Sequence, residues 1–393
     1  MEIKFAARTD LMQASEIREA YKLSAIPGLI AFSGGAPDPT TFPVEELKKS
    51  AVRVFDQYGP LAIQYFMTEG SPELREWIVE HMKKTRNINV PVEEVAIIDG
   101  GQQGLDFTSK IFINEGDILL CENPTYQGAL NAFKAYNPTF MGVETDDDGV
   151  VPEALREVLS KNDVRMIYVN PDFQNPTGRR WTLERRQAFM DVIKDFDVVV
   201  LEDDPYGDLA YDGSLMPPLK SYDEKGQIIY LSSFSKIVAP GLRVAWVSAS
   251  PEILEKYIFA KQAADLQAST LCQMIIADFL KNNSLDDHLK LVRKVYERKG
   301  GVMIDAIRRE FPDSVKVNTP KGGLFLWGEM PQGVDTLEVL RKCAENKVAF
   351  INGRAFFPES GHDNCFRLSF SAAPEDQIPE GIRRMAEVIK TFV

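Results

Sequence analysis

The stretch LSSFSKIVAPGLRVAW, residues 231–246, places a lysine directly after an apolar run and between two serines and an arginine. The Pro-Gly pair that follows Lys236 excludes a continuing helix and turns the chain back, so that Arg243 returns to the same place. The hydroxyls of Ser233 and Ser235 and the guanidinium of Arg243 would form an anion site, because an arginine fork donates two hydrogen bonds to a phosphate. A lysine desolvated beside such cations loses its proton more readily and becomes a nucleophile for a carbonyl group. The alternative is a lysine that lays its stem along the strand end and keeps its charge in water.

Five short apolar runs bounded by turn residues predict buried strands between about residue 94 and Ser233. They are EVAIID ending at Asp99, DILLC at Cys121, VRMIYVN at Asn170, DVVVLED at Asp203 and QIIYLSS at Ser233. Between them lie stretches of helical spacing, such as the one from Thr182, whose apolar face would contain Leu183, Phe189, Val192 and Ile193. Strands that alternate with helices predict an α/β fold, in which a mostly parallel sheet is covered by helices on both faces.

The pattern changes near Pro251 to long helices, in EKYIFAKQAADLQAST and LDDHLKLVRKVYERKGGVMIDAIRREF. After Pro312 come shorter strands, GGLFLWGEM and NCFRLSF, and a last amphipathic helix, IPEGIRRMAEVIKTF. We therefore predict a large domain over residues 45–285 and a smaller α+β domain over residues 286–393. Residues 1–44 are expected to pack on the smaller domain or across the cleft.

The composition of the 393-residue chain is that of an ordinary soluble protein. Its net charge of −13 and its lack of long basic runs argue against a nucleic-acid partner. The four cysteines lie far apart without a C-x-x-C pair, and the histidines add no ligand pattern, so no metal site is predicted. The chain shows neither a signal-peptide core nor an apolar run long enough to span a membrane, so we predict no membrane partner and a cytoplasmic location.

Ligands of an open α/β sheet bind outside the carboxyl ends of its strands, and a glycine turn follows the strand end at Asp99. This turn opens a helix and points the backbone N–H groups near Gly101 and Gln102 at whatever lies above, which suits a phosphate. A tight turn without a ligand also explains the glycines. The glycine patterns of NTPases and of dinucleotide-binding enzymes do not occur at this turn.

Two further strand ends carry unusual polar residues. Asn175 lies in a turn that leads into a helix, and turn chemistry does not require an asparagine there. Asp203 is followed by Asp204, Pro205 and Tyr206. An acid at this edge of a sheet needs a cationic partner, so the pair would form either a magnesium site or a salt bridge.

Together the strand ends supply a phosphate site, a nucleophilic amine, an acid and further hydrogen-bonding groups. Pyridoxal 5'-phosphate requires this set, because its aldehyde binds a lysine, its phosphate needs an anchor and its ring nitrogen needs an acid. The sequence therefore predicts pyridoxal 5'-phosphate as the cofactor.

The chain also resembles a known family in seven blocks that occur in the family's order. They are ASEIREAYKLSAIPGLIAFSGGAPDPTTFP, QYFMTEGSPELREWI, NPTYQGAL, NPDFQNPTG, LEDDPYGDL, SSFSKIVAPGLRVAW and FRLSF. In these blocks it is similar to the fold type I pyridoxal-phosphate aminotransferases of the class I group, and specifically to the kynurenine and 2-aminoadipate aminotransferase branch. The likeness covers nearly the whole chain.

The resemblance implies a role for each residue around the cofactor ring. Lys236 would form the Schiff base with the cofactor and then move a proton between the substrate α-carbon and C4' of the cofactor. Asp203 would pair with the ring nitrogen and keep it protonated. Asn175 and Tyr206 would donate hydrogen bonds to the 3'-oxygen, and Tyr126 would stack on the ring face.

The resemblance also implies the phosphate ligands, which are Ser233, Ser235, Arg243 and the backbone of Gly101 and Gln102. Many close relatives have Ser or Thr where this chain has Gly101, so a hydroxyl contact would be missing while the backbone N–H remains.

Five residues complete the implied site. Tyr65 corresponds to the tyrosine that reaches the phosphate from the neighbouring subunit, which implies a homodimer; the alternative is a core aromatic. Arg367 would bind the substrate α-carboxylate through its fork, beside Asn175. Gly35 lies where the backbone approaches the substrate in relatives. Arg18 either receives a distal carboxylate of the substrate or is a solvated helix charge.

The predicted activity transfers an amino group from an L-amino acid of the 2-aminoadipate, aromatic or branched-chain class to a 2-oxo acid, with 2-oxoglutarate as the expected acceptor, in two half-reactions. A pyridoxal-phosphate lyase on the same scaffold is an alternative, because it would also retain Lys236. A non-catalytic, aminotransferase-like sensor is a second alternative, which the acidic charge and the position of SGGAPDP at Ser33 disfavour.

Overall fold

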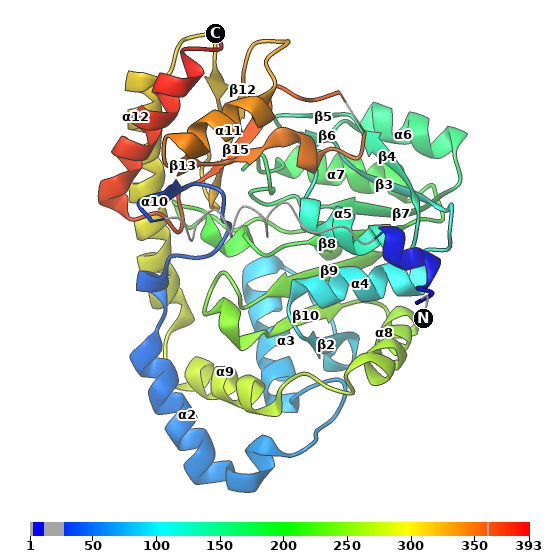
Figure 1. Cartoon of the computed structure of the whole chain (residues 1–393). Helices are drawn as coiled ribbons and strands as arrows, with labels where there is room; N and C mark the ends of the chain where they lie inside the picture. Colours follow the sequence, from blue (N-terminus) through cyan, green and yellow to red (C-terminus); the bar gives the residue numbers. More distant parts are fainter. Residues whose placement is uncertain (1–2, 12–26, 360) are drawn as a thin grey trace.

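A seven-stranded sheet forms the centre of the molecule (Figure 1). The structure is a computed structural model that describes residues 3–11, 27–359 and 361–393. The strand order is β2-β10-β9-β8-β7-β3-β4; β10 is antiparallel to both of its neighbours and the other pairs are parallel. The strands are β2 (Val95–Ile98), β3 (Ile118–Glu122), β4 (Thr139–Val143), β7 (Val164–Val169), β8 (Val199–Asp203), β9 (Ile228–Ser233) and β10 (Ala245–Ser248). The prediction of a mostly parallel sheet is confirmed, and its apolar strands are buried on both faces as that topology requires.

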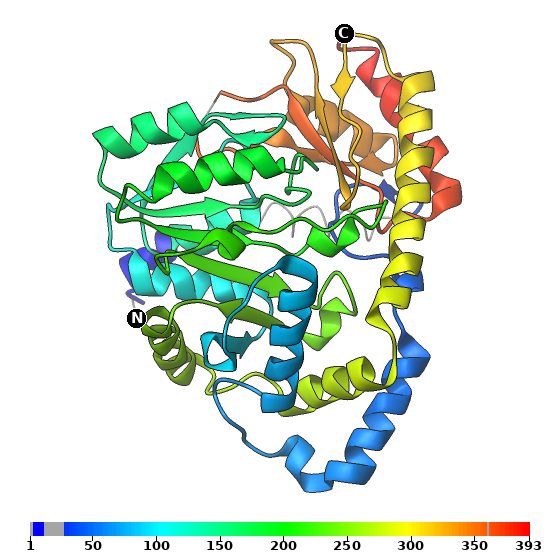
Figure 2. The same cartoon turned by 180° about the vertical axis from the view of Figure 1, so that it is seen from behind.

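Helices cover both faces of this sheet. Figures 1 and 2 show the two faces in turn, the first with α4, α5 and α8 and the second with α3, α6 and α7. The helices are α3 (Pro72–Arg86), α4 (Gly101–Phe112), α5 (Gln127–Lys134), α6 (Pro152–Lys161), α7 (Leu183–Ile193) and α8 (Pro251–Ala264).

The helix predicted from Thr182 is α7, and its apolar face differs at one position. The Thr182 side chain accepts a hydrogen bond from the N–H of Arg185 and caps the helix, as the sequence indicates. Phe189 and Ile193 are buried, but Leu183 is 37% exposed because it lies in the first turn, beyond the edge of the sheet contact.

The helical stretch predicted through to Thr270 is wrong over residues 265–269. Helix α8 ends at Ala264, and Leu266 has φ +69°, a left-handed conformation that a helix cannot include. A new helix, α9 (Thr270–Asn282), begins where the Ser269 side chain accepts a hydrogen bond from the N–H of Cys272.

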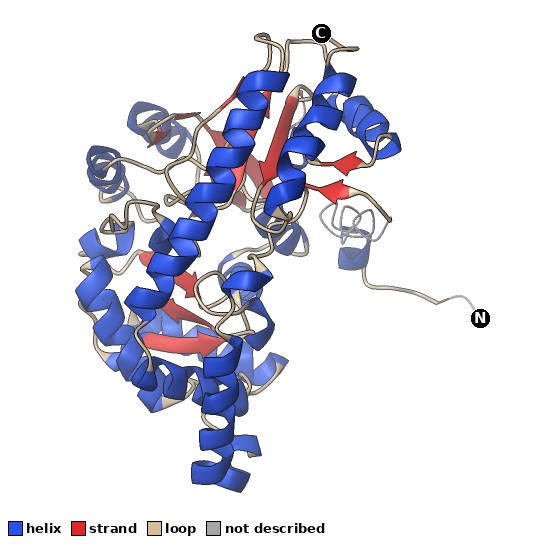
Figure 3. Cartoon of the chain, turned by 90° about the vertical axis from the view of Figure 1, so that its left-hand side faces the viewer, coloured by secondary structure: helices blue, strands red, loops and turns tan. Residues whose placement is uncertain are grey.

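A second, four-stranded antiparallel sheet has the order β11-β12-β15-β14. Figure 3 shows its strands apart from those of the larger sheet, with α10 and α12 beside them. Its elements are β11 (Lys316–Val317), β12 (Phe325–Glu329), β14 (Ile351–Asn352), β15 (Cys365–Ser369), α10 (Leu285–Glu310), α11 (Thr336–Glu345) and α12 (Ile378–Ile389). β1 (Ile30–Ala31) pairs in parallel with β13 (Val348–Ala349), so residues 30–31 lie on this part of the chain. The domain bounds stay a prediction.

Further elements lie between these parts. Among them are α2 (Val44–Tyr58), the hairpin strands β5 (Thr145–Asp146) and β6 (Gly149–Val150), and the 3-10 helices η3 (Gly59–Ile63), η7 (Pro240–Leu242) and η8 (Gly353–Phe356). Of the helices in the described ranges, none combines the length and the apolar character needed to cross a bilayer. The cytoplasmic location stays a prediction.

Candidate active site

The carboxyl ends of β7, β8 and β9 open into a cavity of about 220 Å³. The start of α4 and the turn after η7 close it on the other side. The predicted site residues that line it are Gly101, Gln102, Tyr126, Asn175, Asp203, Tyr206, Ser233, Ser235, Lys236 and Arg243. Residues far apart in the sequence thus meet at the sheet edge where the strand-end argument placed them.

Lys236 points its amine into this region. Its Nζ donates a hydrogen bond to the carbonyl of Gly35 at 2.9 Å. Burial, together with the positive charges of Arg367 and Arg243, lowers the pKa of Lys236 to about 8, although Asp203 opposes the shift. The amine is therefore neutral, and nucleophilic, at a lower pH than an ordinary lysine.

The part of the cavity that is expected to hold the cofactor phosphate lies where the start of α4 packs against Arg243. Gly100 has φ +84°, a conformation that favours glycine, and a Cβ there would lie 2.2 Å from Nη2 of Arg243, so the arginine side chain would have to shift. Arg243 has φ +55° directly after η7, which turns its side chain back to donate to the carbonyl of Asp99 at 3.2 Å. The hydroxyls of Ser233 and Ser235 lie 2.8 Å apart in the same cavity.

Two of the predicted phosphate-binding residues, Gly101 and Gln102, lie at the start of α4. A Cβ on Gly101 would meet nothing within 4 Å, so the space that a serine or threonine side chain would take there is open. Gln102 donates a side-chain hydrogen bond to the carbonyl of Gly128 at 2.9 Å, which ties the start of α4 to α5.

Asp203 ends β8 with its carboxylate buried in the cavity wall. Tyr168 donates to its Oδ2 at 2.9 Å, and the Asn170 side chain donates to its backbone carbonyl at 2.6 Å. Burial raises the pKa of Asp203 to about 7; the hydrogen bond from Tyr168 and the charge of Lys236 lower it, and the charge of Asp204 raises it. Within the described ranges Asp203 forms no ion pair, so the site offers a buried acid to a cation that enters the cavity.

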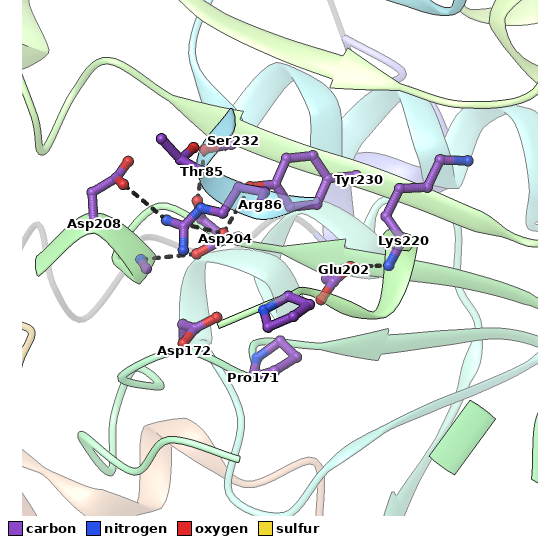
Figure 4. Close-up of polar contacts among 12 residues, drawn as sticks. Thr85, Arg86, Pro171, Asp172, Glu202, Asp204, Asp208, Lys220, Tyr230 and Ser232 are labelled. Carbon is purple, nitrogen blue, oxygen red and sulfur yellow. Dashed lines mark hydrogen bonds and ion pairs between the residues drawn. The ribbon is translucent and has the colours of Figure 1, made fainter. Parts of the chain in front are cut away.

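Asp204 lies on the opposite face of the sheet, in the buried ion network of Figure 4. Its Oδ2 lies 3.6 Å from Nη2 of Arg86 and accepts a hydrogen bond from Tyr230 at 2.7 Å. The same Nη2 lies 3.2 Å from Oδ1 of Asp208. The salt-bridge interpretation of the acid pair therefore holds for Asp204, whereas Asp203 faces the cavity.

Asn175 joins the cofactor cavity to Arg367. Its backbone N–H donates to Oδ1 of Asn170 at 2.9 Å, and its own Oδ1 accepts from Nη1 of Arg367 at 2.7 Å. The hydroxyl of Tyr206 also hydrogen-bonds Asn175, and its buried ring meets Phe325 edge-on.

Arg367 is held with its guanidinium plane fixed. Nη2 donates to the carbonyl of Ser33 at 2.6 Å, and the guanidinium carbon lies 4.5 Å from the ring centre of Phe325 and 5.0 Å from that of Phe356. This packing orients the fork for a planar, bidentate ligand such as a carboxylate.

The other predicted residues occupy three kinds of position. Tyr126 precedes α5 and lines the cavity, and Gly35 approaches the ring of Phe325 so closely that a Cβ would lie 3.1 Å from it. Tyr65 is 76% exposed and lies outside the cavity of its own chain, so the core-aromatic alternative is wrong. Arg18 lies outside the described residues, and its role stays a prediction.

Sequence reasoning missed Tyr168, Asn170, Gly100 and Arg86. The sequence contained a signal for the first two. Tyr168 and Asn170 lie two residues apart at the end of a predicted strand, so their side chains point to the same face of the sheet. No local pattern points to Arg86, because an arginine at a helix end is ordinary.

The site combines a buried amine, a set of anion-binding groups and a buried acid. These groups fit pyridoxal 5'-phosphate, and they define a pyridoxal-phosphate-dependent enzyme. The family model for aminotransferase class I and II matches residues 29–385, so the chain belongs to that family. It is 40% identical over 382 residues to the 2-aminoadipate transaminase of Thermus thermophilus, covering 96% of this chain and 94% of the relative. It is 38% identical over 384 residues to aromatic-amino-acid aminotransferase 1 of Thermococcus litoralis, covering 96% and 92%.

A solved structure agrees with these relatives. The crystal structure of an alpha-aminoadipate aminotransferase from Thermus thermophilus, in complex with N-(5'-phosphopyridoxyl)-L-leucine, matches with a TM-score of 0.92 and 38% identity, covering 99% of this chain and 97% of that one. The predictions of a fold type I aminotransferase, of transaminase activity and of pyridoxal 5'-phosphate as the cofactor are confirmed.

Proposed function

We propose that this aminotransferase moves the amino group of an L-amino acid of the 2-aminoadipate, aromatic or branched-chain class to 2-oxoglutarate, in two half-reactions. The observation that carries the proposal is the placement of Lys236 and Asp203 in one cavity wall, with Arg367 bound to Asn175 of the same wall at 2.7 Å. The carbonyls of Gly35 and Ser33 accept hydrogen bonds from the lysine amine and from the arginine fork. The names of the relatives support the donor class.

Each residue of the site has a proposed task. When bound, the cofactor supplies an electron-accepting ring that stabilises negative charge at the substrate α-carbon. Lys236 would hold the cofactor covalently and, once released, would move the proton between that carbon and C4' of the cofactor. Asp203 holds the proton on the ring nitrogen, and Arg367 fixes the α-carboxylate so that the Cα–H bond faces the lysine.

The remaining site residues hold the cofactor in place. Asn175 and Tyr206 donate to the ring oxygen, and Tyr126 packs on the ring. The proposed phosphate ligands are Ser233, Ser235, Arg243 and the backbone N–H groups of Gly101 and Gln102.

The lowered pKa of Lys236 predicts how the apoenzyme takes up its cofactor. Only the neutral amine attacks the aldehyde, so the association rate should rise with pH and level off above a midpoint near 8, rather than near the ordinary lysine value of 10.5. Stopped-flow absorbance of apoenzyme mixed with pyridoxal 5'-phosphate measures this rate. A rate that keeps climbing to pH 10 would contradict the lowered pKa.

Replacement Arg367→Lys should separate substrate binding from cofactor binding. The charge stays but the bidentate fork is lost, so kcat/KM for L-amino acids should fall about 10²-fold. The absorbance band of the bound cofactor should persist. Primary amines without an α-carboxylate serve as the control, because their slow reaction should not change; an equal loss with these amines would remove the carboxylate role.

A homodimer with shared sites is part of the proposal. Six exposed apolar or aromatic side chains in one stretch of the chain support it, because a partner subunit could cover them. They are Val44, Val52 and Phe55 of α2, Leu61 and Ile63 of η3, and Tyr65 in the loop that follows.

Hybrid dimers test whether Tyr65 acts across the interface. Tyr65→Ala alone should weaken cofactor binding about tenfold, the effect of one hydrogen bond to a charged group. In a hybrid of a Tyr65→Ala subunit with a Lys236→Ala subunit, one site regains both native residues only if Tyr65 reaches the partner's cavity. Cofactor titration of isolated hybrids should then show one tight site per dimer. No tight site would mean that Tyr65 acts within its own chain, and unchanged binding in Tyr65→Ala alone would mean that it has no role.

The experiment that tests the proposed function is an absorption spectrum of the purified protein before and after L-glutamate is added. Glutamate should convert the yellow band of the bound cofactor to the shorter-wavelength amine form, and 2-oxo acids should restore the yellow band. A panel of donors then ranks the amino acids. A yellow band that no amino acid shifts would contradict transamination and favour the lyase or sensor alternatives.

A further inference from the structure

The hydrogen bond between Tyr168 and Asp203 is buried and rigid. Tyr168 is 0% exposed and its hydroxyl donates to Oδ2 of Asp203 at 2.9 Å. Its strand, β7, is the parallel neighbour of β8, with Tyr168 opposite Leu201, so the side chain reaches diagonally to the residue two further along β8. The ring also packs edge-on against Phe133, with centroids 5.4 Å apart, which keeps the phenol from turning away.

This bond occupies one oxygen of Asp203. Tyr168 of β7 donates to Oδ2, and Asn170, which directly follows β7, donates to the backbone carbonyl of Asp203 at 2.6 Å. Tyr168 thereby orients the carboxylate, and Asn170 fixes the backbone that carries it.

We propose that Tyr168 is a positioning residue that makes Asp203 a weaker base, so that the proton shared with the cofactor's ring nitrogen stays on the nitrogen. This inference rests on the proposed function. In a buried pair of a carboxylate and a pyridine nitrogen, the proton stays on the more basic atom. A hydrogen bond donated to the carboxylate stabilises its charged form and so shifts the proton towards the nitrogen.

The charges around the pair agree with this role. Burial raises the pKa of Asp203 to about 7, and the hydrogen bond from Tyr168 is the largest influence that lowers it again. Burial and the charge of Asp203 hold the pKa of Tyr168 well above its ordinary value, so the phenol keeps its proton and remains a donor. Two further charges act on the pKa of Asp203: the charge of Lys236 lowers it, and the charge of Asp204 raises it.

The chain contains a matched control for this bond. Tyr230 on β9 is 1% exposed and donates to Oδ2 of Asp204 at 2.7 Å, in the network of Figure 4. Tyr168→Phe and Tyr230→Phe thus remove the same hydroxyl, from the same kind of bond, at nearly the same burial. Only the first bond belongs to the acid that faces the cavity.

The test compares both variants as holoenzymes loaded with cofactor that carries ¹⁵N in the ring. In Tyr168→Phe the ¹⁵N chemical shift should move towards that of an unprotonated pyridine, and the half-reaction with L-glutamate should slow about 10 to 10²-fold, the scale of one lost hydrogen bond to a charged group. In Tyr230→Phe the shift and the rate should match the wild type.

Each other outcome overturns the inference. An unchanged ¹⁵N shift in Tyr168→Phe, an equal change in both variants, or a loss of folding in Tyr168→Phe alone would assign Tyr168 a purely structural role. Failure of the proposed function is a separate result, because the wild type would then bind the labelled cofactor without reacting with any amino acid.

Discussion

Lys236→Ala should lower the turnover of L-glutamate and 2-oxo acid by about 10⁴-fold or more, because one side chain supplies both the covalent bond and the proton transfer. The variant should still bind the cofactor through the phosphate ligands, but the yellow band of the lysine-bound form should be absent. Steady-state assays and absorbance spectra of the dialysed protein measure the two effects.

Two controls separate these tasks of Lys236. Lys236→Arg keeps the positive charge beside Asp203 but offers no amine for the covalent bond, so it should share the full loss. A small primary amine added to Lys236→Ala should restore part of the turnover, because the missing group is a free base in a cavity that can admit it. Near-normal turnover in either variant would mean that another residue carries the reaction.

Asp203→Asn should slow the first half-reaction about 10³-fold, because an amide stabilises the protonated ring nitrogen far less than a buried carboxylate. The substitution keeps the volume of the side chain and can still accept the hydrogen bond from Tyr168. Single-turnover stopped-flow with L-glutamate measures the rate.

Asp204→Asn is the matched control for this prediction. It removes one charge from the adjacent residue, whose partner Arg86 also contacts Asp208. We expect a lower Tm and little change in the half-reaction. Equal slowing in both variants would indicate that net charge at the sheet edge, and not contact with the cofactor, controls the rate.

Much of the site could be predicted because its residues follow strand ends. Buried parallel strands are continuous apolar runs, so their ends are visible in the sequence, and the topology brings those ends to one edge. Lys236, Asn175 and Asp203 were placed by this rule, and the structure brings them into one cavity wall.

Other parts of the site could not be predicted from the sequence. They depend on which face of the sheet a side chain points to, and on contacts with residues far away in the chain. Asp203 and Asp204 are identical in type and adjacent, and only the structure shows that Arg86 of α3 neutralises the second. The spacing of Tyr168 and Asn170 indicates that the two side chains share a face, but nothing in the sequence identifies Asp203 as the acceptor of the Tyr168 hydroxyl. The break after Ala264 is hidden in the sequence because residues 265–269 include good helix formers. In the structure Leu266 takes a left-handed conformation, and its N–H donates to the carbonyl of Lys261 at 3.0 Å.

The carbonyls of Ser33 and Gly35 lie against both cations of the proposed site. They accept hydrogen bonds from Nη2 of Arg367 and from Nζ of Lys236. If Arg367 binds the substrate α-carboxylate as proposed, that carboxylate competes with the Ser33 carbonyl for the guanidinium. A carboxylate offers a stronger, charge-assisted contact than a neutral peptide oxygen, and an amine without a carboxylate offers none. With that role of Arg367, the backbone of residues 33–35 would favour ligands that carry a carboxylate.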